Sequence, residues 1–204
     1  MESRFDLLAK EWDSKPQRVE SAMKFVDYVK QNTKTNLDDF KVLDYGCGSG
    51  LVSFGFADDV KYIDGFDYSK VMICRYNEKS KELNYTNVKG VIHNINEEDI
   101  SSSGYNLVVT NMTMHHIKDI NRFVQVLKNS LDKDGYLYIA DLVTEDGTFH
   151  SMGNDDVEHL GFDKEFLLNV FKENDFVDIK YGIIQTIYKE NKSYRIFSIS
   201  GKRI

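Results

Sequence analysis

The sequence predicts an α/β fold: a mostly parallel, seven-stranded sheet with helices on both faces, ending in an antiparallel C-terminal hairpin. Short apolar runs alternate with amphipathic segments between residues 41 and 142, which is typical of strand–helix–strand units. A glycine-rich turn follows the first apolar run. Near the C-terminus, two β-rich runs are separated only by a short polar turn, which favours a hairpin.

The first elements lead into the glycine-rich turn. Residues 41–45 form the first predicted strand, and a helix over 49–57 can start from the turn. Residues 61–67 form the second strand, and Ser69 is a suitable N-cap for a helix to about Leu83. Before all of these, an amphipathic helix is predicted from apolar residues at helical spacing: Val19, Ala22, Met23, Val26 and Val29.

The later elements continue the same alternation. The fourth strand is apolar enough to be buried on both faces, and Asp134-Gly135 makes a turn into the fifth. The predicted elements are strands over 87–93, 105–111 and 136–142, a helix marked by Ile120, Phe123, Val124, Leu127 and Leu131, a helix over 163–173, and hairpin strands over 176–188 and 193–200 joined by a turn at 189–192.

A polar, irregular segment over residues 144–161 follows the fifth strand and carries His150 and His159. Long loops after the carboxyl ends of strands are where α/β folds place their chemistry. We therefore expect this segment to be part of an active-site cover.

Composition narrows the class of protein. The 204 residues are 41% hydrophobic and 29% charged, as in a soluble domain, and no apolar run approaches the ~20 residues of a membrane span. The polar N-terminus does not resemble a signal peptide, and Cys47 and Cys74 have no metal-ligand or redox spacing. We expect free thiols and a cytoplasmic location. The net charge of −7 disfavours a nucleic-acid groove, so a small molecule or a protein side chain is the expected partner.

The most informative motif is the stretch from Asp44 to Gly50, Asp-Tyr-Gly-Cys-Gly-Ser-Gly. Glycines without side chains let the backbone approach a ligand closely. Asp67 lies 23 residues beyond Asp44, at the end of the second predicted strand. An acid at about that separation is where a nucleotide-type ligand has its ribose hydroxyls. The two features together predict a ligand-binding half of the fold.

This motif, with Gly65-Phe66-Asp67-Tyr68-Ser69 and Met72, resembles the class I S-adenosylmethionine-dependent methyltransferases. The resemblance extends from about Val42 to the C-terminus. It implies a three-layer, Rossmann-like sandwich, with residues 1–204 as a single methyltransferase domain. Residues 1–38, which include Trp12, Asp13 and Arg18, are then expected to form a helical cover over the active site.

The resemblance also implies the residues that bind S-adenosylmethionine. Asp44 would receive the methionine ammonium, and Asp67 would accept both ribose hydroxyls in a charge-assisted contact. The backbone of Gly46 and Gly48 would lie along the methionine and ribose, with Cys47 as a small filler between them. The remaining expected contacts are Tyr68 and Met72 beside the adenine, the Asn94 side-chain oxygen on its amino group, the Ile95 backbone N–H, and Asn111 at the end of the fourth strand.

Glycine spacing separates this cofactor from NAD. A pyrophosphate-binding turn has the spacing G-x-G-x-x-G, with the third glycine placed for helix packing. Here Gly46, Gly48 and Gly50 alternate, so the last glycine is one residue closer. The spacing favours a sulfonium nucleoside over a dinucleotide.

The acceptor side is expected at residues 110–117, after the fourth strand. The stretch lacks the Asn/Asp-Pro-Pro-aromatic signature of amino-group DNA and glutamine methyltransferases, and its His-His-Ile segment resembles the small-molecule branch of the family. His115, His159 and His150 are candidate bases or hydrogen-bond donors. His115 and His116 are adjacent, so only one is expected to face the pocket. Asp141 either lines the pocket or caps the loop.

The predicted function is methyl transfer from S-adenosylmethionine to a small-molecule acceptor. The histidines show no tight ligand spacing, so no metal is expected. Three alternatives stay open: an NAD-linked oxidoreductase, a non-catalytic S-adenosylmethionine-binding subunit or sensor, and methylation of a protein or RNA. The acceptor and the oligomeric state are not indicated by the sequence.

Overall fold

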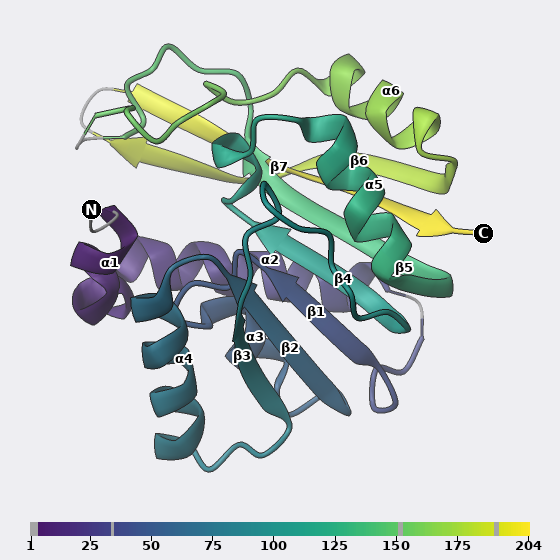
Figure 1. Cartoon of the computed structure of the whole chain (residues 1–204). Helices are drawn as coiled ribbons and strands as arrows, with labels where there is room; N and C mark the ends of the chain where they lie inside the picture. The colour runs from purple at the N-terminus through teal and green to yellow at the C-terminus, as the bar shows by residue number, and fades with distance from the viewer. Residues whose placement is uncertain (1–3, 34, 151–152, 190–191) are drawn as a thin grey trace.

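A computed structural model describes residues 4–33, 35–150, 153–189 and 192–204. Within these ranges one seven-stranded sheet has the order β3-β2-β1-β4-β5-β7-β6 (Figure 1). The strands are β1 (Lys41–Tyr45), β2 (Tyr62–Asp67), β3 (Val88–Ile92), β4 (Tyr105–Asn111), β5 (Leu131–Leu142), β6 (Phe176–Lys189) and β7 (Lys192–Arg203). The helices are α1 (Arg4–Leu8), η1 (Ala9–Ser14), α2 (Pro16–Asn32), α3 (Leu51–Phe56), α4 (Lys70–Glu82), η2 (Met114–His116), α5 (Ile120–Ser130) and α6 (Lys164–Glu173).

The strand directions confirm the predicted fold class. β1 pairs in parallel with both β2 and β4, and β5 continues the parallel set beside β4. β7 runs antiparallel to both β5 and β6. The strand order reverses between β1 and β4, and ligands of open α/β sheets bind at such a point.

Helices cover both faces of the sheet (Figure 1). Side chains of a strand point alternately to its two faces, and β1 shows this directly: Val42 joins the core with α2, α3 and α4, whereas Leu43 joins the core with α5 and α6. Both residues are fully buried. The continuous apolar runs in the sequence therefore come from strands buried on both faces.

Short polar side chains determine where three of the helices begin. Ser69 accepts a hydrogen bond from the backbone N–H of Met72 at 3.1 Å, as predicted for the N-cap of α4. Asp119 and Asp163 cap α5 and α6 in the same way. Each cap satisfies a backbone donor that the helix leaves without an internal partner.

Two boundaries differ from the predictions. β5 begins at Leu131, which pairs with Tyr105 before the Asp134-Gly135 turn, and the register then shifts. Asp134 has a φ of 66°, so the turn is an irregularity inside the strand, as in a β-bulge. α3 begins at Leu51 instead of residue 49, because Gly50, with a φ of 91°, is left-handed and cannot continue a helix.

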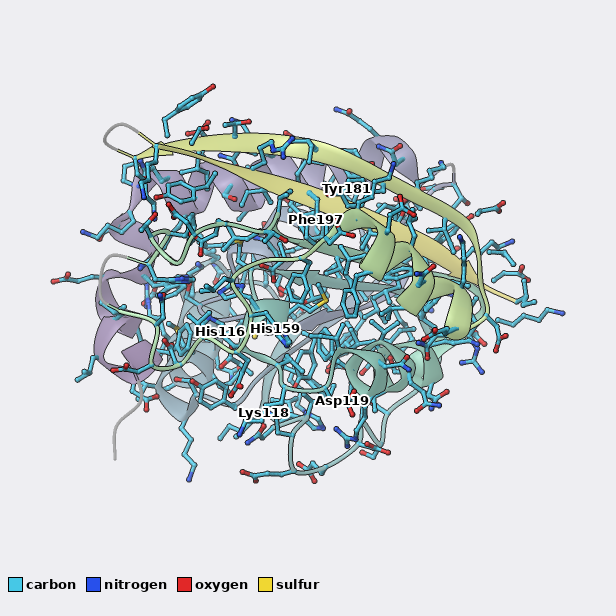
Figure 2. All side chains as sticks on the ribbon, turned by 90° about the horizontal axis from the view of Figure 1, so that it is seen from above. His116, Lys118, Asp119, His159, Tyr181 and Phe197 are labelled. Carbon is cyan, nitrogen blue, oxygen red and sulfur yellow. The ribbon has the colours of Figure 1, made fainter. Side chains whose placement is uncertain are left out.

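The C-terminal hairpin is longer than predicted. Tyr181 and Phe197 stack across β6 and β7, with ring centroids 5.5 Å apart and planes at 18° (Figure 2). The middle of the predicted turn, residues 190–191, lies outside the described residues. None of the helices in the described part of the chain combines the length and apolar content needed to cross a bilayer.

Candidate functional site

A cavity of about 530 Å³ opens at the carboxyl edge of the sheet, where the strand order reverses. Its walls come from the residues that follow β1, β2 and β4, and from the loop after β5. α1, η1 and the start of α2 supply Phe5, Leu8, Trp12 and Arg18 on another side. The chain segments expected to bind cofactor and acceptor therefore share one cavity.

Gly46 and Gly48 have different structural roles in the turn. A Cβ on Gly46, at φ 72°, would lie 2.1 Å from Thr113 Oγ1, so this glycine lets the acceptor-side loop pack against the turn. A Cβ on Gly48, at φ 52°, would meet nothing nearer than Trp12 Nε1 at 3.8 Å. Gly48 therefore leaves backbone open to the cavity, as close approach of a ligand requires.

Asp67 fixes the turn to the end of β2. Its Oδ2 accepts a hydrogen bond from the Gly48 N–H at 2.9 Å, and its Oδ1 accepts one from the Ser69 N–H at 2.9 Å. Burial raises the pKa of this carboxyl group, while the two N–H donors oppose the shift. Each carboxylate oxygen can still accept a second bond, so both remain able to bind a ribose diol.

Asp44, at the end of β1, is the second buried acid beside the glycine turn. Its Oδ2 accepts hydrogen bonds from the Ser53 backbone N–H at 3.1 Å and from the Ser53 hydroxyl at 2.6 Å. Burial nevertheless raises its pKa to about 7. Among the described residues no basic side chain forms an ion pair with it. The fold thus holds a carboxyl group that a bound cation would stabilise.

Nine of the ten expected cofactor residues line the cavity. Ile95 does not: it is 1% exposed, and its N–H donates to Tyr45 Oη at 2.8 Å. Asn94 lines the wall, but its Oδ1 already accepts from the Asn96 N–H at 3.1 Å. The residues in the wall are Asp44, Gly46, Cys47, Gly48, Asp67, Tyr68, Met72, Asn94 and Asn111.

Cys47 and Asn111 have different parts in this wall. Burial raises the pKa of the Cys47 thiol well above its usual value, so the residue is a protonated filler, and both it and Cys74 are free thiols as expected. Asn111 Oδ1 is buried and has no hydrogen-bond partner among the described residues. Such an atom costs free energy unless a ligand supplies a donor.

Taken together, the polar groups at the turn suit a positively charged ligand. Asp44 and Asp67 are both buried and both have raised pKa values, and the Asn111 oxygen adds a further acceptor. S-adenosylmethionine carries an ammonium and a sulfonium, and it carries no phosphate. A pyrophosphate at the glycine turn would place its negative charges near Asp44, which like-charge repulsion disfavours.

The N-terminal elements are attached directly to the cofactor side. Ser69 Oγ donates to Asp6 Oδ1 at 2.6 Å, and Ser49 Oγ donates to Asp13 Oδ1. Asp13 Oδ2 also accepts from Lys79 Nζ, 2.6 Å away on α4. α1 and η1 are thus bound to the glycine turn and to α4.

Phe5 extends this attachment across the cavity. Its ring contacts Tyr68 and His116 edge to face, at centroid distances of 6.0 and 5.2 Å. Tyr68 lies on the cofactor side and His116 on the acceptor side. One aromatic side chain of α1 therefore touches both halves of the site.

Asp141 orients His115 through contacts with its ring and its backbone. Its Oδ1 lies 2.7 Å from His115 Nδ1, and its Oδ2 accepts from the His115 backbone N–H at 3.1 Å. Burial alone would raise the pKa of Asp141, but His115 and the Leu142 N–H outweigh it and keep the pKa below its usual value. Asp141 is outside the cavity wall, so it orients a residue of the site instead of lining it.

The expectation that only one of two adjacent histidines faces the pocket is wrong. His115 and His116 both line the cavity, with ring centroids 4.0 Å apart. They lie in η2, a single 3₁₀ turn, and Asp141 holds the His115 backbone N–H while His116 Nδ1 bonds to the Asp156 carbonyl. Burial, followed by the nearby His115, lowers the pKa of His116.

Of the other expected histidines, one joins this group and one does not. His150 lines the cavity, and its ring centroid lies 5.1 Å from that of His115. His159 lies outside the wall, where its Nε2 donates to the Ile117 carbonyl at 2.9 Å and its backbone N–H donates to the His115 carbonyl at 3.1 Å. Figure 2 shows His159 and His116 on adjoining segments. His159 therefore anchors the 144–161 segment to η2.

Sequence reasoning missed several residues of the wall. Thr113 lies in the expected acceptor-side stretch, but the sequence does not indicate that it packs against Gly46. Phe5, Leu8 and Lys15 also line the cavity, and no motif marks them, because their position depends on how the N-terminal segment folds back. The Asp141–His115 pair joins the end of β5 to η2, which follows the neighbouring parallel strand β4, so it depends on the pairing of these two strands.

Comparison with known proteins agrees with this geometry. Residues 36–200 match the model of a family described as "Methyltransferase domain". An uncharacterized methyltransferase of Schizosaccharomyces pombe is 31% identical over 158 residues, which is 68% of this chain and 56% of that protein. The ubiquinone biosynthesis O-methyltransferase of Glaesserella parasuis is 26% identical over 147 residues, 67% of this chain and 61% of that protein. The chain thus spans about three fifths of the length of these relatives.

Solved structures share the fold. The crystal structure of an S-adenosylmethionine-dependent methyltransferase from Aquifex aeolicus superposes with a TM-score of 0.71 at 17% identity, covering 98% of each chain. The phosphoethanolamine N-methyltransferase 2 of Haemonchus contortus, in complex with S-adenosylmethionine, gives a TM-score of 0.74 at 12% identity. That match covers 98% of this chain and 60% of the other. At these identities the likeness concerns the fold.

Sheet order, glycine turn and paired acids together define a class I S-adenosylmethionine-dependent methyltransferase. The chain belongs to the methyltransferase-domain family whose model it matches. The expected cofactor, S-adenosylmethionine, is confirmed with the family.

Proposed function

We propose that this protein transfers the methyl group of S-adenosylmethionine to a small-molecule acceptor. The observation that carries the proposal is the pair of buried acids at the open glycine turn, Asp44 and Asp67, in the same cavity as three histidines. In this proposal the two acids bind the cationic cofactor at the β1–β2 side of the cavity. The acceptor then lies toward His115 and His150, beyond Thr113.

The size and the walls of the cavity favour a small acceptor. The cavity of about 530 Å³ lies within the ~300–1,000 Å³ usual for small-molecule sites, and the N-terminal elements supply one of its walls. Its acceptor end is partly apolar, with Met112, Phe149 and Ile187 in the wall. The net charge of −7 also disfavours a nucleic-acid acceptor.

Two named relatives fit this proposal. The Glaesserella parasuis protein is named for O-methylation in ubiquinone biosynthesis. A relative from Eschscholzia californica, 25% identical over 119 residues, is named as a tetrahydroprotoberberine N-methyltransferase. Both names describe small organic acceptors, and they support the acceptor class without identifying the compound.

In this proposal the protein's main contribution is position. The cofactor supplies an activated methyl group, and the chain holds the acceptor's nucleophilic atom in line with it and excludes water. Among the described residues His115 Nε2 has no hydrogen-bond partner, so it is the group we expect to face that nucleophile.

The test is transfer of isotope-labelled methyl groups from S-adenosylmethionine in a cell extract divided by size. We expect label in compounds below about 1 kDa and little in the protein and RNA fractions. Label confined to macromolecules would overturn the acceptor class. Cofactor binding without label in any fraction would instead favour a binding subunit or sensor.

A further inference from the structure

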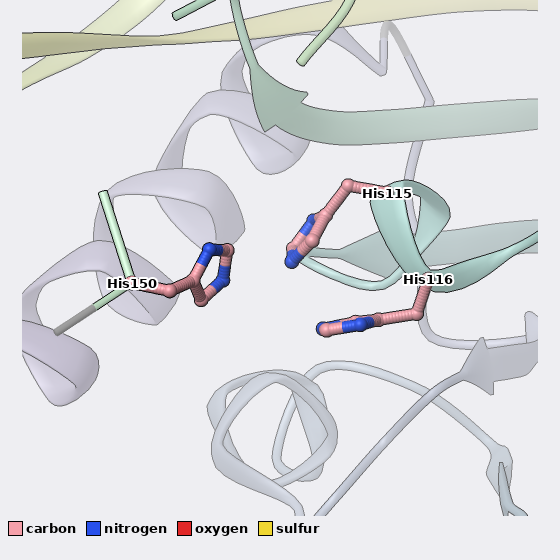
Figure 3. Close-up of side chains that lie close together, drawn as sticks. All are labelled: His115, His116 and His150. Atoms are coloured by element: carbon pink, nitrogen blue, oxygen red, sulfur yellow. The ribbon is translucent and has the colours of Figure 1, made fainter. Parts of the chain in front are cut away.

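Three imidazoles converge at the acceptor end of the cavity (Figure 3). His115 and His116 come from η2, and His150 comes from the loop after β5. One ring nitrogen of each lies within 4.8 Å of the corresponding nitrogens of the other two. The sequence did not predict this grouping, because 34 positions separate His150 from His116.

The ring tautomers of His115 and His116 are fixed by their outer contacts. Asp141, an ionised carboxylate, can only accept, so His115 Nδ1 must donate across the 2.7 Å contact. His116 Nδ1 must likewise donate to the Asp156 carbonyl at 2.5 Å. In the neutral form of each ring the lone pair is then on Nε2. Histidine ligands of metals almost always donate their other N–H to a carboxylate or carbonyl.

His115 Nε2 is the second observation that points to a ligand. The His115 side chain is only 2% exposed, and within the described residues this nitrogen has no hydrogen-bond partner. A buried acceptor without a donor costs free energy. A cation bound to this nitrogen and to the neighbouring imidazoles satisfies it.

We propose that His115, His116 and His150 bind one divalent first-row transition ion of the Zn²⁺ type, with a fourth position open to the acceptor. Imidazole ligands suit Zn²⁺, Cu²⁺ and Ni²⁺ more than Mg²⁺ or Ca²⁺. Three protein ligands with one open position is the arrangement of catalytic zinc sites. With Zn–N distances of ~2.0–2.1 Å the nitrogens stand roughly 3.4 Å apart, so the rings, His150 above all, rotate inward on binding.

The open position selects an acceptor with a hydroxyl or thiol group. This part rests on the proposed methyl transfer, whereas ion binding does not. The hydroxyl or thiol releases its proton to solvent as it binds the ion, because the bound cation lowers its pKa. The anionic oxygen or sulfur then bonds to the methyl carbon as the carbon–sulfonium bond breaks, and that electron pair stays on the cofactor's sulfur. The ion thus takes the place of a histidine base.

The test is a titration of the full chain, stripped with a chelator, with Co²⁺ as a coloured probe followed by visible absorption. Competition by Zn²⁺ is measured in the same cuvette. We expect one Co²⁺ per chain, displaced by Zn²⁺. His150→Ala should weaken Co²⁺ binding by more than ~100-fold, and Asp141→Asn, which replaces one of the two acceptor oxygens beside His115 with a donor and removes the charge, by ~10–100-fold. The matched control His159→Gln keeps a donor to Ile117 outside the cluster and should bind Co²⁺ like the wild type.

Calorimetry with S-adenosylhomocysteine shows in parallel that each variant is folded, since His150 is on the acceptor side. Equal Co²⁺ affinity in the wild type and in His150→Ala would overturn the site. So would a wild-type stoichiometry near zero in a protein that still binds S-adenosylhomocysteine. Co²⁺ binding in a protein that methylates nothing would leave the ion site intact and count against the proposed function.

Discussion

At the scale of single residues, Asp44 is a site residue that lowers the stability of the folded protein when it is ionised. Its carboxyl group is fully buried and accepts hydrogen bonds only from Ser53 among the contacts described. Its pKa of about 7, against an ordinary 3.8, means that the folded protein holds this proton more tightly than the unfolded chain. The charged form therefore destabilises the free protein, and we propose that the ammonium of the cofactor offsets that cost.

The first prediction concerns Asp44→Asn. The group's contribution to stability is complete below pH 3.8 and is lost as pH rises toward about 7, an effect of about 4 kcal/mol at ~1.4 kcal/mol per pKa unit. We expect the variant to unfold at higher urea concentration than the wild type at pH 8, and to lose this advantage near pH 4. It should also bind S-adenosylmethionine far more weakly. Asp64→Asn is the control, because Asp64 on β2 accepts from Tyr105 outside the cavity wall.

The same pKa predicts the pH dependence of cofactor binding. Only the ionised Asp44 attracts the methionine ammonium, so the affinity of the wild type for S-adenosylmethionine should fall up to about tenfold per pH unit below about 7. Calorimetry between pH 5.5 and 8.5 measures this. In Asp44→Asn the pH dependence should be shallower over that range, and a slope equal to that of the wild type would exclude Asp44 as its source.

Asp67 carries a separate prediction. Asp67→Ala should weaken S-adenosylmethionine binding by more than ~10-fold, because the ribose diol loses a charge-assisted acceptor. The change also frees the Gly48 and Ser69 N–H groups. Asp67→Asn retains an acceptor oxygen and should lie between the wild type and Asp67→Ala. Unchanged affinity in the alanine variant would remove Asp67 from the cofactor site.

At the scale of secondary-structure elements, the sequence did not indicate which residues of the N-terminal segment contact the site. Residues 1–38 were expected to cover the active site, and we retain that as a proposal. Ser49 and Lys79 both bind Asp13, and Phe5 contacts Tyr68 and His116. These contacts connect the segment to the rigid sheet edge through a few side chains, as expected of an element that opens for ligands.

A variant of Asp13 tests the cover. Asp13→Ala removes the partner of both Ser49 and Lys79, so we expect faster hydrogen exchange in residues 4–14. We also expect several-fold faster dissociation of S-adenosylhomocysteine. Glu11→Ala, an exposed acid on the same 3₁₀ helix, is the control. A cover that is already open in the free protein would give the same exchange in Asp13→Ala and in the wild type.

The spacing of apolar residues predicted most helices and strands, because buried strands form continuous apolar runs and helices begin at short polar N-cap residues. β5 was predicted to start too late because the Leu131–Tyr105 pairing is a contact between strands, which local sequence does not encode. The expectation that only one of His115 and His116 faces the cavity was wrong for a similar reason. The shape of η2 depends on Asp141 and Asp156, which lie in other segments.

At the scale of the whole molecule, the sheet topology assembles the site. The reversal between β1 and β4 puts the glycine turn next to the loop after β4, and Thr113 fills the space that Gly46 leaves. The residues of the expected cofactor side could be predicted from the sequence, because the glycine motif is contiguous and the second acid lies at a characteristic separation from it. The acceptor half combines η2, the loop after β5 and the N-terminus, which only the fold brings together.

The most direct test of the central claim is calorimetry of the wild-type protein at pH 8 with S-adenosylmethionine and, separately, with NAD. The buried acids at the open turn predict binding of one S-adenosylmethionine per chain, and no measurable binding of NAD, whose pyrophosphate would lie near Asp44. Tight binding of NAD, with none of S-adenosylmethionine, would contradict the account.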